Sequence, residues 1–285
     1  MKLDNVLAGY VAGPRGRDGL CLALLLRERV HARLTVATVQ PPAWSAPGPS
    51  KAEESAWRAY LREQAAAMLD QARELAGDDA EYVTHPYRGS GRGLLELARR
   101  SGADVVVIGS APGGGRGRIA LGSTADQLLH ASSVPVLLAP RGFGDDPPPA
   151  FERLTLAYRR GPGCDAAIKD AARTAAVLDV PLRLVTLVVS PGRRRKIEKD
   201  MLGSLRDQAA ADLRAAARGR SSVDVEVLEG RNVAQALGTT TWLRGEMIIC
   251  ASSDTGPLRR VFLGDTSIKI VKAATCPVMI LTRQP

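Results

Sequence analysis

The chain of 285 residues is long enough for one large or two medium domains, and its 45% hydrophobic content can fill sizeable cores. Aromatic residues make up only 4%, so aliphatic side chains must build these cores. No stretch approaches the roughly eighteen uninterrupted apolar residues of a membrane span, and the N-terminus does not resemble a signal peptide. We therefore expect a cytoplasmic protein with no membrane partner.

The net charge of +9 would attract nucleic acids or other polyanions. Aromatic residues, however, are not interleaved with the basic ones. We therefore expect the basic residues to be spread over a solvated surface, and we do not expect nucleic acid as a partner. One dense basic cluster, Arg193, Arg194, Arg195 and Lys196, follows a Pro-Gly pair in a loop or at a helix start. The pattern assigns no role to this cluster.

Four cysteines are scattered without C-x-x-C spacing, and the three histidines lie far apart. This spacing favours neither a zinc site nor a disulfide framework. Buried free thiols are expected at Cys21, Cys164, Cys250 and Cys276.

The first predicted elements alternate between strand and helix. Residues 5–10 read as a strand, and a Gly-Pro loop leads to a helix that Asp18 is placed to cap. Residues 34–39 read as a second strand and residues 41–49 as a loop. A long amphipathic helix over 51–75 follows, with Trp57 and Met68 expected in the core. A strand at 81–87 and a helix at 93–101 complete this part.

Residues 105–141 contain a strand, a glycine-rich loop, a helix and a second strand. Residues 105–108 are an apolar run bounded by glycine, residues 125–130 have helical character, and residues 134–138 form a strand with Pro135 at its entry. Ser123 or Thr124 is expected to cap the helix. Glycine amides and the positive end of this helix favour an anion such as phosphate, although a solvated loop that binds nothing has the same composition.

Residues 142–152, GFGDDPPPAFE, cannot continue a helix or a central strand and are expected to be a linker. Beyond them the pattern repeats: strands are expected at 154–158, 182–189 and 223–228, and a long helix at 197–218. Residues 246–250 and 276–280 match 104–108 and 134–138 at one offset of 142 residues. We therefore predict two tandem α/β domains, 1–141 and 153–285. Each is doubly wound and Rossmann-like, a five-stranded mainly parallel sheet with helices on both faces.

The glycine-rich stretch resembles the universal stress protein signature G-x2-G-x9-G-[ST], which is followed by a helix and a V-P-V strand. Gly109 matches the first glycine, Gly122 the third and Ser123 the hydroxyl, while Pro112 stands in place of the second glycine. With its repeat, the resemblance covers nearly the whole chain apart from the linker. It implies a stress-response or regulatory protein that binds ATP or another adenine nucleotide weakly, through domain 1 only.

The resemblance implies a set of nucleotide-binding residues in the first domain: Val11, Val39, Gly109, Gly113, Gly122, Ser123 and Thr124. Family members that bind ATP carry an acidic residue at the end of the first strand, but here Val11 takes that position and Arg159 takes it in the second copy. Pro112 removes one amide donor, which the glycines at 113–115 replace from a shifted position. Arg116 and Arg118 either meet phosphates or face solvent.

The second copy departs further from the signature. Ala251 and Asp254 replace two glycines, and Asp265 replaces the hydroxyl residue after Gly264. A carboxylate at a helix start would itself accept the free amides and repel phosphate, so the second copy is expected to bind no nucleotide.

Two other readings remain open. An interaction module in which both nucleotide sites are degenerate is the first, motivated by Val11, Pro112, Arg159 and Asp265. An adenylating or pyrophosphatase enzyme is the second, but the S-G-G-x-D-S loop of that superfamily is missing after the first strand. No paired carboxylates or nucleophile with a histidine partner stand out, His130 suits a helix end, and at most slow nucleotide hydrolysis is expected.

The last strand of each copy bears on assembly. Residues 134–138 and 276–281 are apolar edge candidates that should not stay exposed. Since such strands often pair in this family, we expect the two copies to pair through them within one chain, and a homodimer to form.

Overall fold

A computed structural model describes residues 2–42, 50–161, 163–190, 196–218, 223–251 and 265–282. It divides into two compact units, Lys2–Pro147 and the remainder from Pro148 onward. None of the helices in these described ranges is both long enough and apolar enough to cross a membrane.

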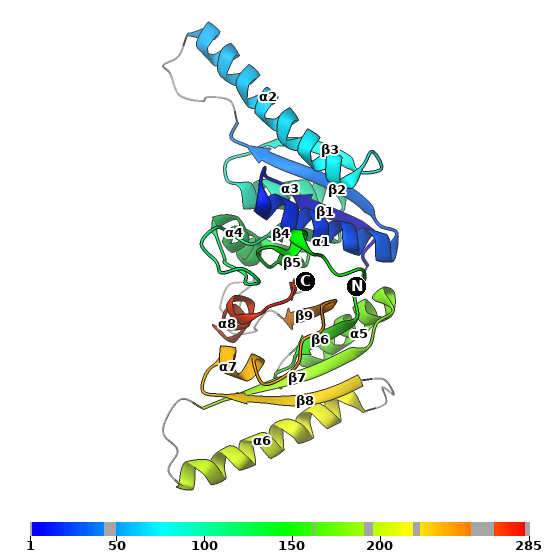
Figure 1. Ribbon diagram of the computed structural model, residues 1–285, viewed down its shortest axis with the longest axis vertical. Helices are drawn as coiled ribbons and strands as arrows, with labels where there is room; N and C mark the ends of the chain where they lie inside the picture. Colours follow the sequence, from blue (N-terminus) through cyan, green and yellow to red (C-terminus); the bar gives the residue numbers. More distant parts are fainter. Residues whose placement is uncertain are drawn as a thin grey trace. The chain divides into compact units, whose positions relative to one another are not determined.

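The first unit alternates strands and helices along the chain (Figure 1). Its elements are β1 Asn5–Gly9, α1 Pro14–Val30, β2 Arg33–Gln40, α2 Lys51–Ala76, β3 Glu81–Pro86, α3 Ser90–Ser101, β4 Val105–Gly109, α4 Ser123–Ala131, β5 Val136–Ala139 and the 3-10 turn η1 Phe143–Asp145. The strands are parallel in the order β3-β2-β1-β4-β5. The chain therefore reverses its direction of travel across the sheet between β1 and β4.

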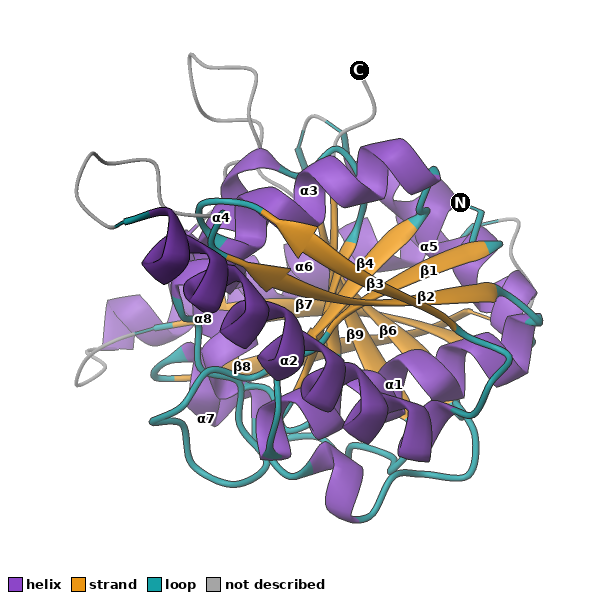
Figure 2. Ribbon diagram, turned by 90° about the horizontal axis from the view of Figure 1, so that it is seen from above, coloured by secondary structure: helices purple, strands orange, loops and turns teal. Residues whose placement is uncertain are grey.

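That strand order places the helices on both faces of the sheet (Figure 2). Right-handed crossovers put α1 and α2 on one face and α3 and α4 on the other, and each pair packs together. Both faces of the central strands are thereby covered, which explains why residues 105–107 of β4 and Val6 and Leu7 of β1 are almost completely buried. The predicted α/β fold with a parallel sheet is confirmed.

The start of α1 differs from the prediction. The helix begins at Pro14 after Gly13, so Asp18 lies inside it and does not cap it. Its buried carboxylate instead accepts hydrogen bonds from the amides of Gly142 and Gly144, each at 2.8 Å. The turn η1 at the start of the predicted linker is therefore anchored on α1. The sequence could not show this pairing because the partners lie more than a hundred residues apart.

The limits of helix α2 were predicted correctly, but the side chains predicted to be buried were not. Trp57 is 37% exposed and stacks on Tyr60 with ring centroids 5.5 Å apart, and Met68 is only half-buried. The buried side chains all lie in the second half of the helix and are mainly alanines: Ala65, Leu69, Ala72 and Ala76. The first half of α2 extends past the ends of the strands (Figure 1), so a large apolar side chain there has no sheet to pack on.

The second unit repeats the strand–helix order of the first. Its elements are β6 Arg153–Ala157, α5 Cys164–Leu178, β7 Leu182–Val189, α6 Lys196–Ala217, β8 Val223–Gly230, α7 Val233–Leu237, β9 Glu246–Ala251, α8 Asp265–Ala273 and β10 Val278–Leu281. The strands are again parallel, in the order β8-β7-β6-β9-β10. Each strand of the first unit thus has a counterpart, whereas α7 is a much shorter equivalent of α3.

Several predicted features lie outside the described residues. These are the basic cluster at 193–195, Asp254 and Gly264; Lys196 opens α6, but its side chain is not described. Cys250 and Cys276 are buried free thiols as expected, while Cys21 and Cys164 are only half-buried. Burial raises the pKa of Cys250 to about 12, so this thiol stays protonated near neutral pH.

Candidate functional site

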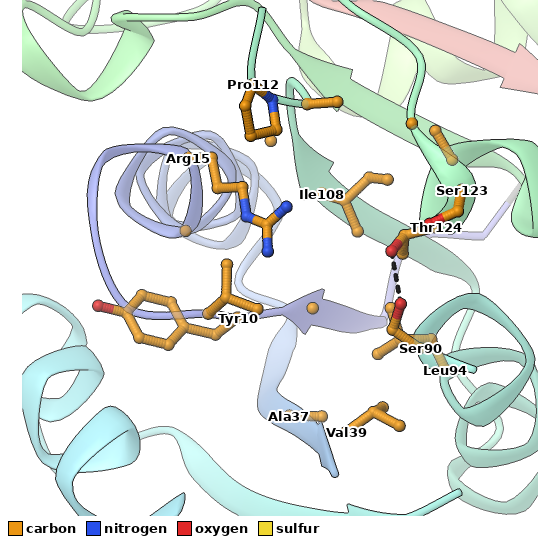
Figure 3. Close-up of a pocket in the computed structure, with 17 residues that line it drawn as sticks. Tyr10, Arg15, Ala37, Val39, Ser90, Leu94, Ile108, Pro112, Ser123 and Thr124 are labelled. Carbon is orange, nitrogen blue, oxygen red and sulfur yellow. Dashed lines mark hydrogen bonds between the residues drawn. The ribbon is translucent and has the colours of Figure 1, made fainter. Parts of the chain in front are cut away.

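A cavity of about 390 Å³ lies in the first unit where β1, β2 and β4 end. This is the point at which the strand order reverses, and open parallel sheets bind ligands in the crevice beyond the carboxyl ends of their strands at such a point. Its walls come from residues 9–11, from α1, β2, α3 and β4, and from the loop and helix that follow β4 (Figure 3).

The floor of the cavity depends on close backbone packing between α1 and β4. A Cβ atom on Gly109 would lie 1.9 Å from the carbonyl oxygen of Arg15, and one on Gly16 would lie 1.8 Å from that of Val11. Neither position can therefore carry a side chain without moving the backbone. Gly109, the first glycine of the signature, is thus required for α1 to approach the end of β4.

The helix α4 presents its N-terminus to the cavity without a side-chain cap. Its N-cap residue is Gly122, so Ser123 and Thr124 lie in the first helical turn. The prediction that one of them caps the helix is therefore wrong. Helix geometry leaves the first amides, those of residues 123–125, without an intrahelical acceptor. All three residues line the cavity. The cavity therefore has free N–H donors and the positive end of a helix dipole in its wall.

Polar contacts fix the start of α3 against α4. The hydroxyls of Ser90 and Thr124 lie 2.5 Å apart (Figure 3). The amide of Arg92 donates to the side-chain oxygen of Gln127 at 3.1 Å, so a residue of α4 caps α3. The helix that carries the free amides is thereby held in place by its neighbour.

The glycine-rich loop between β4 and α4 is also held by specific bonds. Within the loop, the amide of Ala120 donates to the hydroxyl of Ser110 at 2.9 Å. From outside it, the guanidinium of Arg141 donates to the carbonyl of Gly114 at 2.7 Å, and Arg116 pairs with Asp145 at 2.8 Å. Arg116 is therefore engaged outside the cavity.

Arg15 supplies the charged side chain of the cavity lining. It lies in the first turn of α1, and Figure 3 shows its guanidinium pointing into the cavity. Across the described ranges of the chain, this guanidinium makes no hydrogen bond or ion pair. Its donors are available to a ligand.

The end of the cavity away from the N-terminus of α4 is apolar. Ala37 and Val39 of β2 and Leu94 of α3 form this wall (Figure 3). Tyr10 adds an aromatic ring. The pKa of its phenolic hydroxyl is raised, first by burial and then by the negative charge of Glu74, so the hydroxyl stays neutral. A flat apolar group would fit this wall, while an anion would suit the α4 end.

Six of the seven residues predicted for the site line this one cavity: Val11, Val39, Gly109, Gly122, Ser123 and Thr124. Gly113 does not line it, whereas its neighbour Pro112 does. Sequence reasoning missed Arg15 and Ser90. For Arg15 a signal was available, because a Gly-Pro pair after a strand marks a helix start and places the next residues beside the strand end.

The corresponding helix start in the second unit is different. Asp265 begins α8, and its carboxylate pairs with Lys269 at 2.5 Å, with 80% of the Asp265 side chain exposed. Among the described residues it accepts no bond from a helix amide, contrary to the prediction. A lysine one turn along the helix competes for the carboxylate. The loop before α8 lies outside the described residues.

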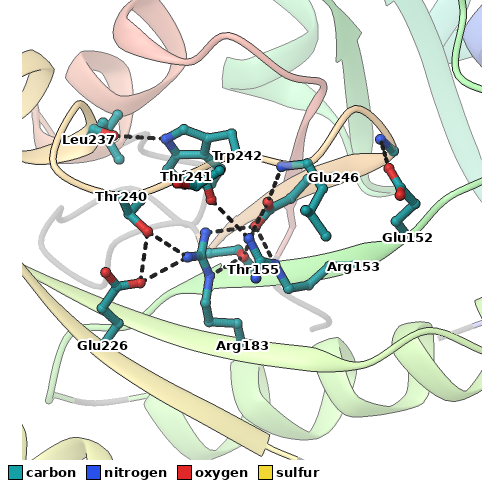
Figure 4. A network of polar contacts seen from close by, with 12 residues as sticks. Glu152, Arg153, Thr155, Arg183, Glu226, Leu237, Thr240, Thr241, Trp242 and Glu246 are labelled. Carbon is teal, nitrogen blue, oxygen red and sulfur yellow. Dashed lines mark hydrogen bonds and ion pairs between the residues drawn. The ribbon is translucent and has the colours of Figure 1, made fainter.

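The second unit also contains a buried polar cluster at the start of β9 (Figure 4). The fully buried Glu246 accepts bonds from Arg153 at 2.7 and 3.0 Å, from Arg183 at 2.7 Å and from the hydroxyl of Thr155. The amide of Leu243 donates a further bond at 3.0 Å. This carboxylate has a full set of donors.

Arg183 is the buried cation of the same cluster. Its remaining donors reach Glu226 at 2.8 Å, Thr240 at 2.9 Å and Thr155 at 3.0 Å, and its guanidinium lies 4.9 Å from the centre of the Trp242 ring. Every side-chain nitrogen and oxygen atom of the central pair has a hydrogen-bond partner within the cluster, which indicates a structural role. The described residues also contain no group of three or more His, Cys, Asp or Glu side chains that could hold a metal.

The cluster predicts how stability depends on pH. Burial alone would raise the pKa of the Glu246 carboxyl, but bonds from Arg153 and Thr155 and the charge of Arg183 outweigh burial, and the pKa lies below its usual 4.5. A carboxyl with a lowered folded pKa contributes stability above its unfolded pKa and loses it as the pH falls through the folded value. We therefore expect the free energy of unfolding of the second unit to decrease below about pH 4.5.

Urea unfolding between about pH 6 and about pH 3 would measure this decrease. The decrease should be smaller in Glu246→Gln, which has no charge to lose. An equally steep decrease in that variant would show that other carboxyls are responsible.

Comparison with known proteins agrees with this fold. A model of the universal stress protein family matches residues 3–140 and again residues 150–282. A universal stress protein of Mycobacterium tuberculosis (strain H37Rv) is 33% identical over 293 residues, which cover 97% of this chain and 99% of that protein. A Mycobacterium bovis protein of the same description matches equally well.

Solved structures share the fold of the whole chain. A universal stress protein from Archaeoglobus fulgidus has a TM-score of 0.62 at 15% identity and covers 99% of this chain and 100% of its own. A Pseudomonas aeruginosa protein described as a putative universal stress protein has a TM-score of 0.61 at 14% identity, with 99% and 94% covered. With two successive matches to the family model and a relative matched over almost its full length, this chain belongs to the universal stress protein family, in a tandem two-domain form.

Proposed function

We propose that the first unit binds an adenine nucleotide in the cavity beyond β1, β2 and β4, and that the protein serves as a stress-response or regulatory module. The observation that carries this proposal is the uncapped N-terminus of α4 inside a cavity of ligand size. The free amides of Ser123 and Thr124 and the dipole of α4 suit the phosphates. The close approach at Gly109 keeps side chains out of that space.

The rest of the cavity suits the nucleoside. Val39, Ala37 and Leu94 offer an apolar surface against which a purine base can lie. The sugar then lies between this surface and the α4 amides, over the end of β1. We infer binding in preference to rapid catalysis, because the lining residues among those described include no carboxylate, imidazole or thiol to act as a base.

The proposals for domain boundaries and for assembly are the ones that the sequence predicts. We propose that residues 1–141 and 153–285 form the two domains, that the two copies pair through their last strands, and that a homodimer forms in the cytoplasm. In the second unit, Ala251 at the end of β9 and Asp265 at the start of α8 favour the proposal that no nucleotide binds there.

Calorimetric titration of ATP into the full-length chain tests the nucleotide proposal. We expect saturable heat with one nucleotide per chain. Gly122→Val should abolish it, because even a Cβ at Gly122 would lie 2.8 Å from the Cβ of Ala111, and a branched side chain would cover the α4 amides.

Ala131→Val is the matched control, since it introduces the same side chain at the exposed far end of α4. This control should bind ATP like the original chain. No heat at millimolar ATP with a folded full-length chain would refute the proposal and favour an interaction module in which both nucleotide sites are degenerate.

A further inference from the structure

The cavity contains a second, separate place for an anion. Among its lining residues Arg15 is the charged one, and across the described ranges its guanidinium has no protein partner. Figure 3 shows it reaching into the cavity from α1, on the wall opposite Ser90 and Thr124. The free amides of α4 and the donors of Arg15 therefore face a ligand from different sides.

The part of the cavity beside Arg15 offers few side-chain acceptors for sugar hydroxyls. Val11 is apolar, and the hydroxyl of Tyr10 is directed away from Arg15 (Figure 3). A guanidinium carries only donors and binds phosphate through parallel hydrogen bonds. In dinucleotide-binding folds, a carboxylate accepts from a free ribose hydroxyl, whereas an arginine accommodates a ribose phosphate. Here the arginine is present and a carboxylate is absent from the described lining.

We propose that the preferred ligand is an adenine nucleotide with a second phosphate on the 2′ or 3′ oxygen of its ribose, and that Arg15 binds this phosphate. The inference rests on the proposed function, because it takes the base to lie against Val39 and the 5′-phosphate at α4. The ribose then lies over the end of β1, next to Arg15. The ligand class follows from two separated anion sites with an apolar wall between β2 and α3.

Titration of the full-length chain with four nucleotides tests this proposal. The probes are adenosine 3′,5′-bisphosphate, adenosine 2′,5′-bisphosphate, AMP and ADP. ADP carries two phosphates on the 5′ side, so it separates the number of phosphates from their position. We expect one of the bisphosphates to bind at least about tenfold more tightly than AMP and ADP, as a charged hydrogen-bonded pair contributes.

Arg15→Met should remove this advantage and leave the affinity for AMP unchanged. The matched control is Arg92→Met, which loses the same charge from an exposed residue at the start of α3 outside the cavity lining. It should keep the preference for the bisphosphate.

Three outcomes would overturn the inference. ADP binding as tightly as both bisphosphates would show no ribose phosphate site, and equal weakening of AMP and bisphosphate by Arg15→Met would place Arg15 at the 5′-phosphate. Both leave the proposed nucleotide site in place. No binding of any of the four nucleotides would refute the proposed function as well.

Discussion

Replacing Ser123 with aspartate should abolish nucleotide binding by the first unit without lowering its thermal stability. Ser123 is the first residue of α4 and lines the cavity. A carboxylate there interacts favourably with the helix dipole, which contributes about 0.3–1 kcal/mol. The same carboxylate repels a phosphate at the free amides by about 3 kcal/mol or more in a partly dry cavity, which weakens binding at least about a hundredfold.

The two effects can be measured on one sample, by thermal unfolding and by calorimetric titration with ATP. Ser123→Asn is the matched control, because it has nearly the same shape as aspartate without the charge. It should reduce affinity by only a few-fold. Undiminished binding by Ser123→Asp would mean that the phosphates do not lie at the α4 N-terminus.

Replacing Glu246 with leucine should destabilise the second unit by about 3–5 kcal/mol, since this change leaves two arginines without their buried partner. Arg183 is 3% exposed and its guanidinium lies 4.9 Å from the centre of the Trp242 ring, so a charge left unpaired there is buried. A loss of this size would lower the unfolding temperature of the second unit by about 10 °C or more. Denaturant and thermal unfolding would both report it.

A second substitution separates the buried charge from general loss of packing. In Glu246→Leu combined with Arg183→Met, the more deeply buried of the two arginines is removed as well and only Arg153, whose side chain is 18% exposed, stays unpaired. Much of the lost stability should therefore return. Arg58→Ala serves as the control for an exposed pair, because Arg58 and Glu54 are both solvent-accessible and the loss there should stay below about 1 kcal/mol. If the double variant were as unstable as the single one, uncompensated charge would not be the cause.

The strands and helices were largely predictable because their causes are local. The buried strands β4 and β9 appear as continuous apolar runs, and a tandem repeat lets each copy support the assignment of the other. Gly109 and Gly122 were located through the universal stress protein signature, and the structure gives the physical reason: an added Cβ would meet the Arg15 carbonyl at Gly109 and the Ala111 side chain at Gly122. The helix limits were less predictable, and α3 begins three residues before the expected position.

The failures share a different cause. Helical spacing placed Trp57 in the core, but only the length of the sheet beneath α2 decides which turns of that helix have something to pack on. The spacing of Asp18 suited a cap, but its carboxylate is buried against amides of η1. In both cases the residue type was compatible with the predicted role, and a distant segment determined the actual one.

The sequence by itself determined the repeated α/β fold, the parallel strands and the position of the glycine-rich loop, because hydrophobic periodicity acts over a few residues and the glycine spacing matches a family signature. Only the tertiary structure decided that Arg15 and Ser90 line the same cavity as Ser123, and that Arg183 and Glu246 form a buried pair. These groups come from segments far apart in the chain. Parallel sheet pairing and helix packing bring them together, and no local pattern encodes the distance between them.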